Sequence, residues 1–311
     1  MSPFIPRTYV SATPPSLINL VYYRWGLMLA AHTVDFATAA RVARRAGEFL
    51  WKNVPFLYEG IRGTIASALQ STHDPDQIET IAREFATNTL LGFLEAEFIH
   101  RKLTRGTWRR HVRCKNVERL AGTVRAGRGV VGVGGYFGNH QMGVTAFGHL
   151  LSGKVAGIVS PLQYTTQQRW MAGMVRGGLA RLYPAGDAIH NAFQALRDGR
   201  LVLIMGEHVS SKRNAVEATF LGAPHRFYPS AALMAWRARC PLAVVTCHRL
   251  DEPFQFELGV RDWIEPLERG GKAWIRQATI RVARSLEASI LERPAQYAWV
   301  NRHLLAGQPN G

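Results

Sequence analysis

Side chains that could move a proton gather in two short stretches of the chain. The stretch GGYFGNHQMG contains Tyr136, His140 and Gln141, and the stretch LIMGEHV contains Glu207 followed directly by His208. A histidine held by a carboxylate can act as a general base, because its pKa lies near neutral pH and the acid fixes its tautomer. These two stretches are therefore the candidate site for acid–base chemistry.

The spacing of these residues suggests separate roles. His140 follows Tyr136 by four residues, so on a helix their Cβ atoms would lie about 5–6 Å apart. His140 is therefore a candidate base, the alternative being that it only packs there. Glu207 follows a buried strand, at the edge of an α/β sheet where ligands bind, which favours a role in the site. Adjacent strand residues point to opposite faces, so we expect His208 to act separately from Glu207 and to be structural or at the rim.

The turn before His140 has the residues of an anion site. Gly138 and Asn139 would shape a tight turn and expose backbone N–H groups where a helix begins. Such groups can bind a phosphate or the oxyanion of a tetrahedral intermediate. A routine helix cap is the alternative interpretation.

The elements that must position these residues follow an α/β order. Residues 1–105 read as a helical segment, including an amphipathic helix at 34–51 and a long one capped by Asp74 and Pro75. After Thr107, helices and strands alternate. We expect strands at 108–114, 129–135, 154–160, 200–206, 241–250 and 254–263, and helices at 116–127, from 139 onward, 165–182, 187–199, 229–239 and 271–291.

This alternation predicts a mixed, mostly parallel sheet flanked by helices. The helical residues 1–105 should pack on an α/β domain formed by residues 106–311, and the two should make one compact unit. No Walker A motif is present and VGVGGYFGN does not fit the GxGxxG spacing. The sequence therefore predicts no cofactor.

The chain is strongly basic. Lys and Arg outnumber Asp and Glu by 38 − 22 = +16, which attracts phospholipid surfaces, acidic carrier proteins, coenzyme A or RNA. A charged fraction of 19% with 47% hydrophobic residues excludes a disordered chain. The scattered Cys114, Cys240 and Cys247 form no CxxC pair, which argues against disulfides or a metal site and favours the reducing cytoplasm.

No secretory signal is evident at the amino terminus. The apolar run LINLVYYRWGLMLAA, residues 17–31, is shorter than the roughly 20 residues needed to span a bilayer, and Arg24 interrupts it. It predicts a helix lying in a membrane interface or packing on the body. We therefore expect a cytoplasmic protein, peripheral at the inner membrane if this helix meets lipid.

Four segments in order resemble the bacterial late acyltransferases of lipid A biosynthesis, within the lysophospholipid acyltransferase-like superfamily. GRGVVGVGGYFGNHQMG resembles that family's GRGVILLTGHFGNWELG-like sequence, and LIMGEHV its LLPDQD-like strand end. ATFLGAPHRF and PAQYAWVNRHL resemble its PFFGRPA-like hairpin and PEQWLWLHRRW-like end. The resemblance covers about residues 62–304 and implies a glycerolipid acyltransferase-like fold, with acyl transfer from a thioester to a hydroxyl.

The resemblance also shows where this chain departs from the family. The histidine and acid of the family's H-x4-D/E signature fall on Tyr136 and Gln141, and its active-site arginine falls on Ser160. Tyrosine, with a pKa near 10, is a poor base, and glutamine has no charge to stabilise an imidazolium. None of the eleven histidines has an acid five residues later. Glu207 matches the family's aspartate after the strand.

The resemblance gives the basic residues near the hairpin a role. The family's hairpin borders its pocket, so a cluster here could hold a phosphopantetheine phosphate or a phosphorylated acceptor. A solvated loop is the alternative. The cluster comprises Lys212, Arg213, His225 and Arg226.

We therefore expect a divergent acyltransferase that moves an acyl group from acyl carrier protein or acyl-CoA to a hydroxyl or amine. The acceptor would be a lipid or a small molecule such as a specialised-metabolite intermediate, and a nucleophilic amine would need little help from a base. The expected catalytic residues are Tyr136, His140, Gln141 and Glu207, and the expected substrate-binding residues are Gly138, Asn139, His208, Lys212, Arg213 and Arg226.

Two other functions fit the same residues. A non-catalytic protein could keep the groove to bind a lipid or an acyl carrier. An aminoacyl transferase could take its activated ester from aminoacyl-tRNA, since a basic chain can hold RNA phosphates. Trp108 beside Arg109 and Arg110 is compatible with RNA or with a membrane surface.

Overall fold

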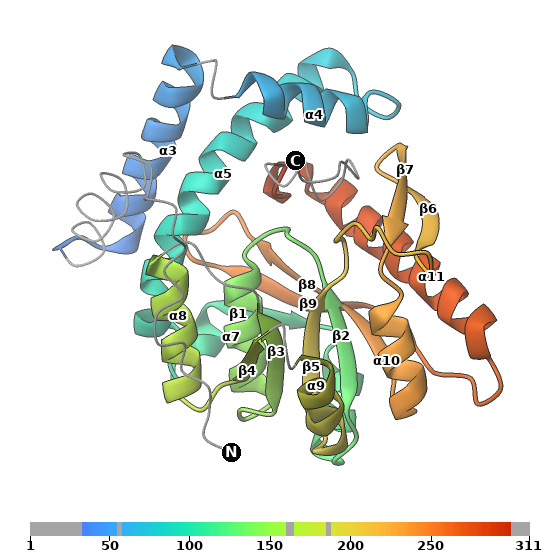
Figure 1. Ribbon diagram of the computed structural model, residues 1–311. Coiled ribbons are helices and arrows are strands. Elements are labelled where there is room, and N and C mark those ends of the chain that lie inside the picture. Colours follow the sequence, from blue (N-terminus) through green and yellow to red (C-terminus); the bar gives the residue numbers. More distant parts are fainter. Residues whose placement is uncertain (1–32, 55–57, 160–164, 185–187, 300–311) are drawn as a thin grey trace.

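The computed structural model describes residues 33–54, 58–159, 165–184 and 188–299. The apolar run at 17–31 and Ser160 lie outside the described residues. The first helices are α3 (Phe36–Asn53), α4 (Glu59–Leu69) and α5 (Pro75–Lys102), which lie along the upper left of Figure 1. α5 begins where predicted, with Asp74 and Gln77 forming a capping box and Pro75 in the first turn.

The sheet has the predicted mixed, mostly parallel form. Its order in the described residues is β1-β9-β8-β2-β5-β3-β4, and every pair is parallel except β8 with β9. The strands are β1 (Val112–Lys115), β2 (Val130–Gly134), β3 (Val155–Val159), β4 (Arg181–Pro184), β5 (Leu201–Met205), β8 (Leu242–Arg249) and β9 (Phe256–Ile264). A separate antiparallel hairpin joins β6 (Val216–Phe220) to β7 (Ala223–Phe227).

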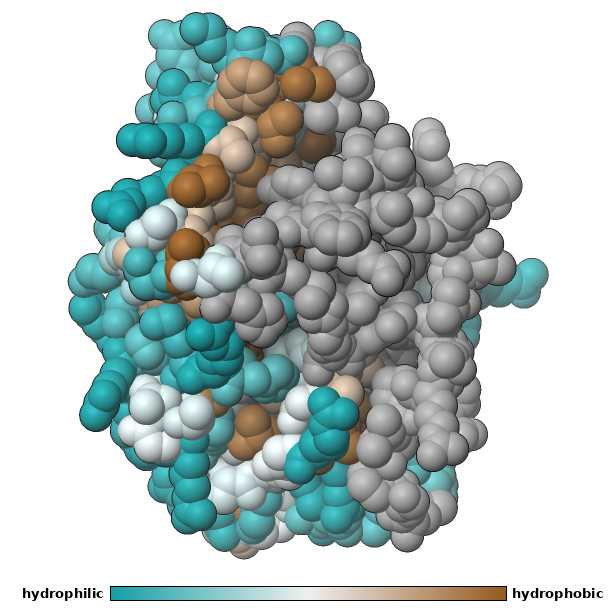
Figure 2. Space-filling view, turned by 90° about the vertical axis from the view of Figure 1, so that its left-hand side faces the viewer, coloured by the Kyte–Doolittle hydropathy of each residue, from teal (hydrophilic) through white to brown (hydrophobic). Residues whose placement is uncertain are grey.

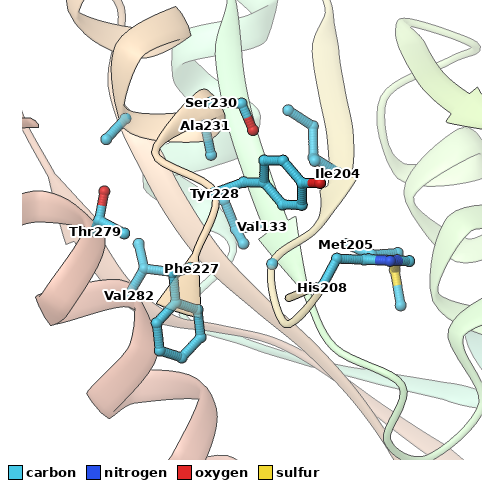
Figure 3. Close-up of a pocket in the computed structure, with 12 residues that line it drawn as sticks. Val133, Ile204, Met205, His208, Phe227, Tyr228, Ser230, Ala231, Thr279 and Val282 are labelled. Atoms are coloured by element: carbon cyan, nitrogen blue, oxygen red, sulfur yellow. The ribbon is translucent and has the colours of Figure 1, made fainter. Parts of the chain in front are cut away.

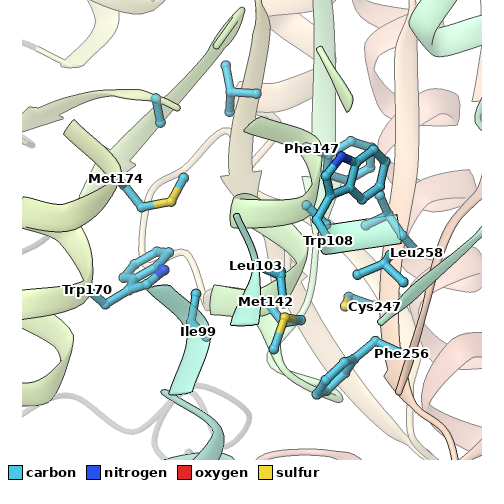
Figure 4. Packing of buried hydrophobic residues seen from close by; sticks show 14 of the residues in the cluster. Ile99, Leu103, Trp108, Met142, Phe147, Trp170, Met174, Cys247, Phe256 and Leu258 are labelled. Carbon is cyan, nitrogen blue, oxygen red and sulfur yellow. The ribbon is translucent and has the colours of Figure 1, made fainter. Parts of the chain in front are cut away.

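Different helices cover the two faces of the sheet. On one side α5 packs with α6 (Glu118–Arg125), α7 (His140–Leu150) and α8 (Thr165–Arg176). On the other lie α9 (Ala188–Arg197), α10 (Ser230–Ala238) and α11 (Gly271–Glu292), the last two on the right of Figure 1. Figure 4 shows the first core, where Trp108, Phe147 and Trp170 pack among aliphatic side chains.

The structure corrects two sequence predictions. Residues Trp108–Arg110 form a short 3-10 helix, so the first strand begins only at Val112. The helix predicted over 165–182 ends at Arg176, because Gly177 and Gly178 break it and Gly178 takes a φ of +65°. The chain then enters β4, which pairs with β3.

α3 packs with its small side chains inward. Ala39, Ala40, Ala43 and Gly47 are buried, and Gly47 lies so close to Thr87 of α5 that an added Cβ would stand 2.8 Å from the threonine hydroxyl. Val42 and Phe49 of α3 point outward, whereas Phe36 is buried, and Figure 2, which faces this side of the molecule, shows brown side chains among teal ones. None of the described helices has both the length and the apolar character to cross a bilayer.

Candidate active site

The candidate site forms where β2 and β5 end side by side. Gly134 pairs with Met205 in the parallel register, so the residues after both strands meet at one edge of the sheet. Glu207 is 1% exposed there. Its carboxylate accepts hydrogen bonds from the backbone N–H of Tyr136 and from the hydroxyl of Tyr297. Glu207 thus ties the end of β5 both to the segment after β2 and to the C-terminal segment.

The environment of Glu207 favours its neutral form. Burial raises the pKa of its carboxyl to about 7, although the hydrogen bonds from Tyr297 and from the Tyr136 amide oppose the rise. Burial also raises the pKa of the Tyr297 hydroxyl, and the Glu207 charge adds to that rise. The carboxyl is therefore shared between its charged and neutral forms near neutral pH.

Tyr136 lies between two histidines. Its hydroxyl is 3.0 Å from Nε2 of His208, and its ring meets the His140 ring edge-on, with centroids 5.7 Å apart. Burial, with the nearby Glu207 charge, raises the pKa of the Tyr136 hydroxyl to about 12. The phenol therefore keeps its proton at neutral pH and can serve as a hydrogen-bond donor, but not as a base.

His140 is the first residue of α7. Burial lowers the pKa of its imidazole to about 4, so the ring is neutral at neutral pH. Within the described ranges, no side chain or backbone group hydrogen-bonds to the ring. His140 lies beside Tyr136 as predicted, but not through helical spacing, because α7 begins only at His140 and Tyr136 precedes it.

Glu207 and His208 contact opposite ends of Tyr136. The carboxylate of Glu207 holds the backbone N–H, whereas the His208 ring reaches the hydroxyl. Both residues lie after the end of β5, and together they hold one tyrosine. Catalytic roles for Glu207 and His208 stay predictions.

Two amides of the turn before α7 are bonded to backbone carbonyls. The N–H of Gly138 donates to the carbonyl of Gln296 at 2.9 Å, and that of Asn139 donates to the carbonyl of Cys247 at 3.2 Å. These two amides are therefore not available to an anion, and anion binding where the helix begins stays a prediction. The Asn139 side chain accepts from the N–H of Met142 at 3.0 Å, so the alternative interpretation as a helix cap is correct.

Gln141, which stands where the family places its acid, is 6% exposed on the first turn of α7. Its carbonyl accepts from the hydroxyl of Thr145 at 2.8 Å. The role predicted for its side chain stays a prediction.

A pocket opens beside His208 (Figure 3). Its hydroxyl-bearing lining residues are Tyr228, which is 39% exposed, Ser230 and Thr279. The rest of the lining is mainly apolar and comes from β2, β5 and the residue after it, β7, α10 and α11: Val133, Ile204, Met205, Gly206, Phe227, Ala231, Ala232 and Val282. An apolar wall with few polar groups is typical of a site for a small organic group.

The predicted basic cluster is only partly available. Lys212 and Arg213 are exposed, but Arg226 donates to the carbonyl of Lys212 at 3.0 Å and lies 3.8 Å from Glu217. His225 is 4% exposed, and its Nε2 lies 3.2 Å from the carbonyl oxygen of Glu207. His225 is therefore part of the interior rather than of a phosphate-binding surface.

Burial tests the expectations for Trp108 and for the cysteines Cys240 and Cys247. Trp108 is 2% exposed and stacks on His149, so it does not present an aromatic surface to RNA or lipid. Cys240 and Cys247 are buried, as predicted, and burial raises the pKa of both thiols, to about 12 for Cys240. Neither is an activated nucleophile.

Sequence reasoning missed three residues that organise the site. Tyr297 holds Glu207, and a buried ion pair of Glu95 with Arg249 lies directly behind the turn before α7. Glu95 interrupts the apolar run LLGFLEAEF, and a buried acid inside such a run signals a partner elsewhere. Nothing in the local pattern around Arg249 indicates that it is this partner.

Comparisons with known proteins show what the chain is similar to. The sequence model of a family described as "Bacterial lipid A biosynthesis acyltransferase" matches residues 70–306. Among solved structures, the 1-acyl-sn-glycerophosphate (LPA) acyltransferase PlsC from Thermotoga maritima is similar, with 11% identity and a TM-score of 0.38 over 81% of this chain and 97% of that one. No curated protein matches the chain.

Proposed function

The chain belongs to the bacterial lipid A biosynthesis acyltransferase family, and from this premise we propose that it transfers an acyl group from a thioester donor to an amine. A hydroxyl acceptor is the second choice. The hydrogen bond between Tyr136 and His208, beside the uncommitted imidazole of His140, is the observation that carries the proposal. The Tyr136 hydroxyl supplies a hydrogen-bond donor and the His140 imidazole supplies a base, at a place where the histidine that the family uses as its base is missing.

In this proposal the acceptor nitrogen attacks the thioester carbonyl, so a C–N bond forms and the C–S bond breaks. Attack makes the nitrogen cationic and acidic, so even a base with a pKa of about 4 can take its proton. His140 receives that proton and passes it to the departing thiolate. A hydroxyl acceptor would need a stronger base, which is why this site favours an amine or hydroxylamine.

Tyr136 stabilises the charge that develops on the carbonyl oxygen. If Nε2 of His208 carries the proton, it donates to the phenolic oxygen, and the phenol O–H is then left to donate to the oxyanion. Glu207 holds the Tyr136 backbone in place for this contact and does not itself meet the reacting atoms.

The donor would be acyl carrier protein or acyl-CoA, whose phosphates suit the exposed Lys212 and Arg213 at the loop beside the pocket. The test follows free thiol and acylated product with both donor classes, with and without hydroxylamine. We expect amine-dependent thiol release that falls in His140→Ala. Strong transfer to a lipid hydroxyl with no turnover of amines would refute the choice of acceptor. No turnover with any thioester would refute the donor class and make aminoacyl-tRNA the next donor to test.

We also propose that the outer face of α3 rests on an anionic lipid surface, which supports a peripheral location. Val42 and Phe49 lie two turns apart on this face and are 63% and 64% exposed. Exposed arginines and a lysine flank them: Arg41, Arg44, Arg45 and Lys52. Bulky apolar side chains between cations are typical of helices in a membrane interface.

Vesicle flotation tests this location. The protein should float with anionic vesicles and not with zwitterionic ones, and Val42→Ser with Phe49→Ser should abolish flotation. Ile189→Ser is the matched control, because Ile189 is 70% exposed on α9. Equal flotation of both variants would exclude α3 as the contact.

A further inference from the structure

A buried ion pair lies behind the site, outside its pocket. Glu95 of α5 is 1% exposed and Arg249, the last residue of β8, is 6% exposed. The guanidinium donates two hydrogen bonds to the carboxylate: Nη2 lies 2.9 Å from Oε2, and Nε contacts Oε1. Such a pair usually adds little net stability, because its attraction is offset by the loss of hydration. Stability alone therefore does not explain why this ion pair is buried here.

One end of the pair fixes the helix that carries His140. Glu95 Oε2 also accepts a hydrogen bond of 2.8 Å from Nδ2 of Asn139. This contact fixes the amide so that its oxygen faces the N–H of Met142, at 3.0 Å. Without Glu95 the amide could turn over and lose the cap, and the first turn of α7 would loosen.

The other end fixes the segment that carries Tyr297. Arg249 Nη1 donates to the side-chain oxygen of Asn88 at 2.7 Å, and Asn88 donates to the carbonyl of Ala295 at 3.0 Å. The backbone N–H and C=O of Arg249 bind the amide of Gln296 at 2.8 and 2.9 Å. Tyr297, the next residue, holds Glu207.

We propose that Glu95 and Arg249 are positioning residues for the acyl-transfer site. Through Asn139 they set the first turn of α7 and His140, and through Asn88 and Gln296 they set Tyr297 and thereby Glu207. The catalytic part of this inference rests on the proposed function. The positioning itself does not, because it concerns only which segments the pair holds.

Two double variants separate positioning from stability. Glu95→Gln with Arg249→Met removes both charges but keeps a carbonyl oxygen for Asn139, whereas Glu95→Leu with Arg249→Met removes that acceptor too. Each single substitution should lower the melting temperature by about 10 °C, because it strands a buried charge or its partners. Both double variants should recover most of that loss.

Amide hydrogen exchange of the peptide over residues 136–147 is the first measurement, and it needs no substrate. The Leu/Met protein should exchange at least about 10-fold faster there than the Gln/Met protein, with equal exchange in α11. Its kcat for acyl transfer should fall by roughly 100-fold, as small displacements of catalytic groups do. The Gln/Met protein keeps the contact with Asn139 but loses that of Arg249 with Asn88, so its kcat should fall by less, about 10-fold.

The outcomes are decisive without a known donor. Wild-type protection over residues 136–147 in the Leu/Met protein would overturn the proposal. Failure of the wild type to transfer acyl groups would refute the proposed function but leave the exchange result standing. If the Leu/Met protein does not fold, Asn139→Ser replaces it, because serine keeps a cap oxygen but lacks the amide that reaches Glu95. Unchanged exchange in Asn139→Ser would likewise overturn the proposal.

Discussion

The hydroxyl of Tyr136 lies 3.0 Å from Nε2 of His208, and this contact joins the segments that follow two neighbouring parallel strands. The family signature puts a histidine at position 136, where its imidazole would act as the base. Here the imidazole comes from the other strand, and the residue at 136 is a phenol whose pKa is raised to about 12. In the proposed function, the phenol donates to the oxyanion and His208 orients it.

Removing the phenolic hydroxyl should slow acyl transfer without unfolding the protein. Tyr136→Phe keeps the ring contact with His140 and deletes the proposed oxyanion donor together with its hydrogen bond to His208. Loss of one such donor costs about 100- to 1,000-fold in kcat in well-studied hydrolases, and we expect a fall in that range with little change in KM. Steady-state kinetics with the best thioester donor measure it.

Tyr228→Phe is the matched control, since Tyr228 lines the pocket beside His208 and its hydroxyl has no hydrogen bond to His208 among the described residues. It should keep kcat within about threefold of wild type. Equal losses in both variants would mean that the Tyr136 hydroxyl has no special part in the reaction.

Much of the fold could be predicted because its signals are local. Asp74 and Pro75 fix the start of α5 through cap chemistry, and alternating apolar runs give the sheet its class. β4 was not predicted because its four residues show no alternation of apolar and polar side chains. Only the pairing with β3 makes them a strand. The division at residues 105 and 106 stays a prediction. The Glu95–Arg249 pair, which joins the two parts, supports their folding as one unit.

The site was harder to predict because its contacts are not local. The sequence placed Tyr136, His140, Glu207 and His208 near one sheet edge, which follows from strand ends alone. It could not show that Tyr297 reaches Glu207 across 90 residues, because that depends on how α11 returns the chain to the site. The hydrogen-bond acceptors of the Gly138 and Asn139 amides could not be predicted for the same reason, since they come from β8 and the C-terminal segment.

Glu207→Gln should change how stability depends on pH. The carboxyl has a pKa of about 7 in the folded chain against 4.5 as a free group, so the folded state holds its proton more tightly. That contribution is complete below pH 4.5 and is lost as pH rises through 7, by on the order of 3 kcal/mol in total.

The glutamine side chain does not titrate, so the stability of Glu207→Gln should not fall as pH rises through 7. At pH 5 it should be less stable than wild type by about 1–3 kcal/mol, because its NH2 group cannot accept a hydrogen bond from Tyr136 or Tyr297. The gap should narrow or reverse at pH 8.5. Urea unfolding across that range measures the difference, and a constant gap would show that Glu207 does not titrate near neutrality.

His248 should weaken the fold in mild acid. Its ring is 5% exposed and stacks on Phe137 with centroids 5.3 Å apart, and neither nitrogen has a hydrogen-bond partner among the described residues. Burial lowers its pKa to about 4; Glu292 and Glu257 oppose this lowering, and Arg293 and Arg261 add to it. The depressed pKa means that stability present above pH 6.5 is lost as pH falls to 4, by on the order of 3 kcal/mol.

His248→Phe should remove that loss, because phenylalanine keeps the stack and sacrifices no hydrogen bond. Thermal unfolding between pH 7 and 4 measures the slope for each protein. His190→Gln on α9 is the control, since its exposed side chain stays in water in both states and should leave the wild-type slope unchanged. A variant that keeps the wild-type acid slope would place the titrating group elsewhere.

Gly138 is the backbone position on which the turn before α7 depends. Its φ is +62°, and an added Cβ would stand 1.9 Å from the carbonyl oxygen of Cys247. Gly138→Ala must therefore push the turn away from β8, breaking the bond from the Asn139 amide to that same carbonyl. We expect the free energy of unfolding to fall by more than about 2 kcal/mol.

Gly122→Ala, at an open position within α6, should instead stabilise by about 0.5–1 kcal/mol. Chemical denaturation of both variants compares them directly. If both alanines were tolerated equally, the close contact between the turn and β8 could not be what holds His140 in the site.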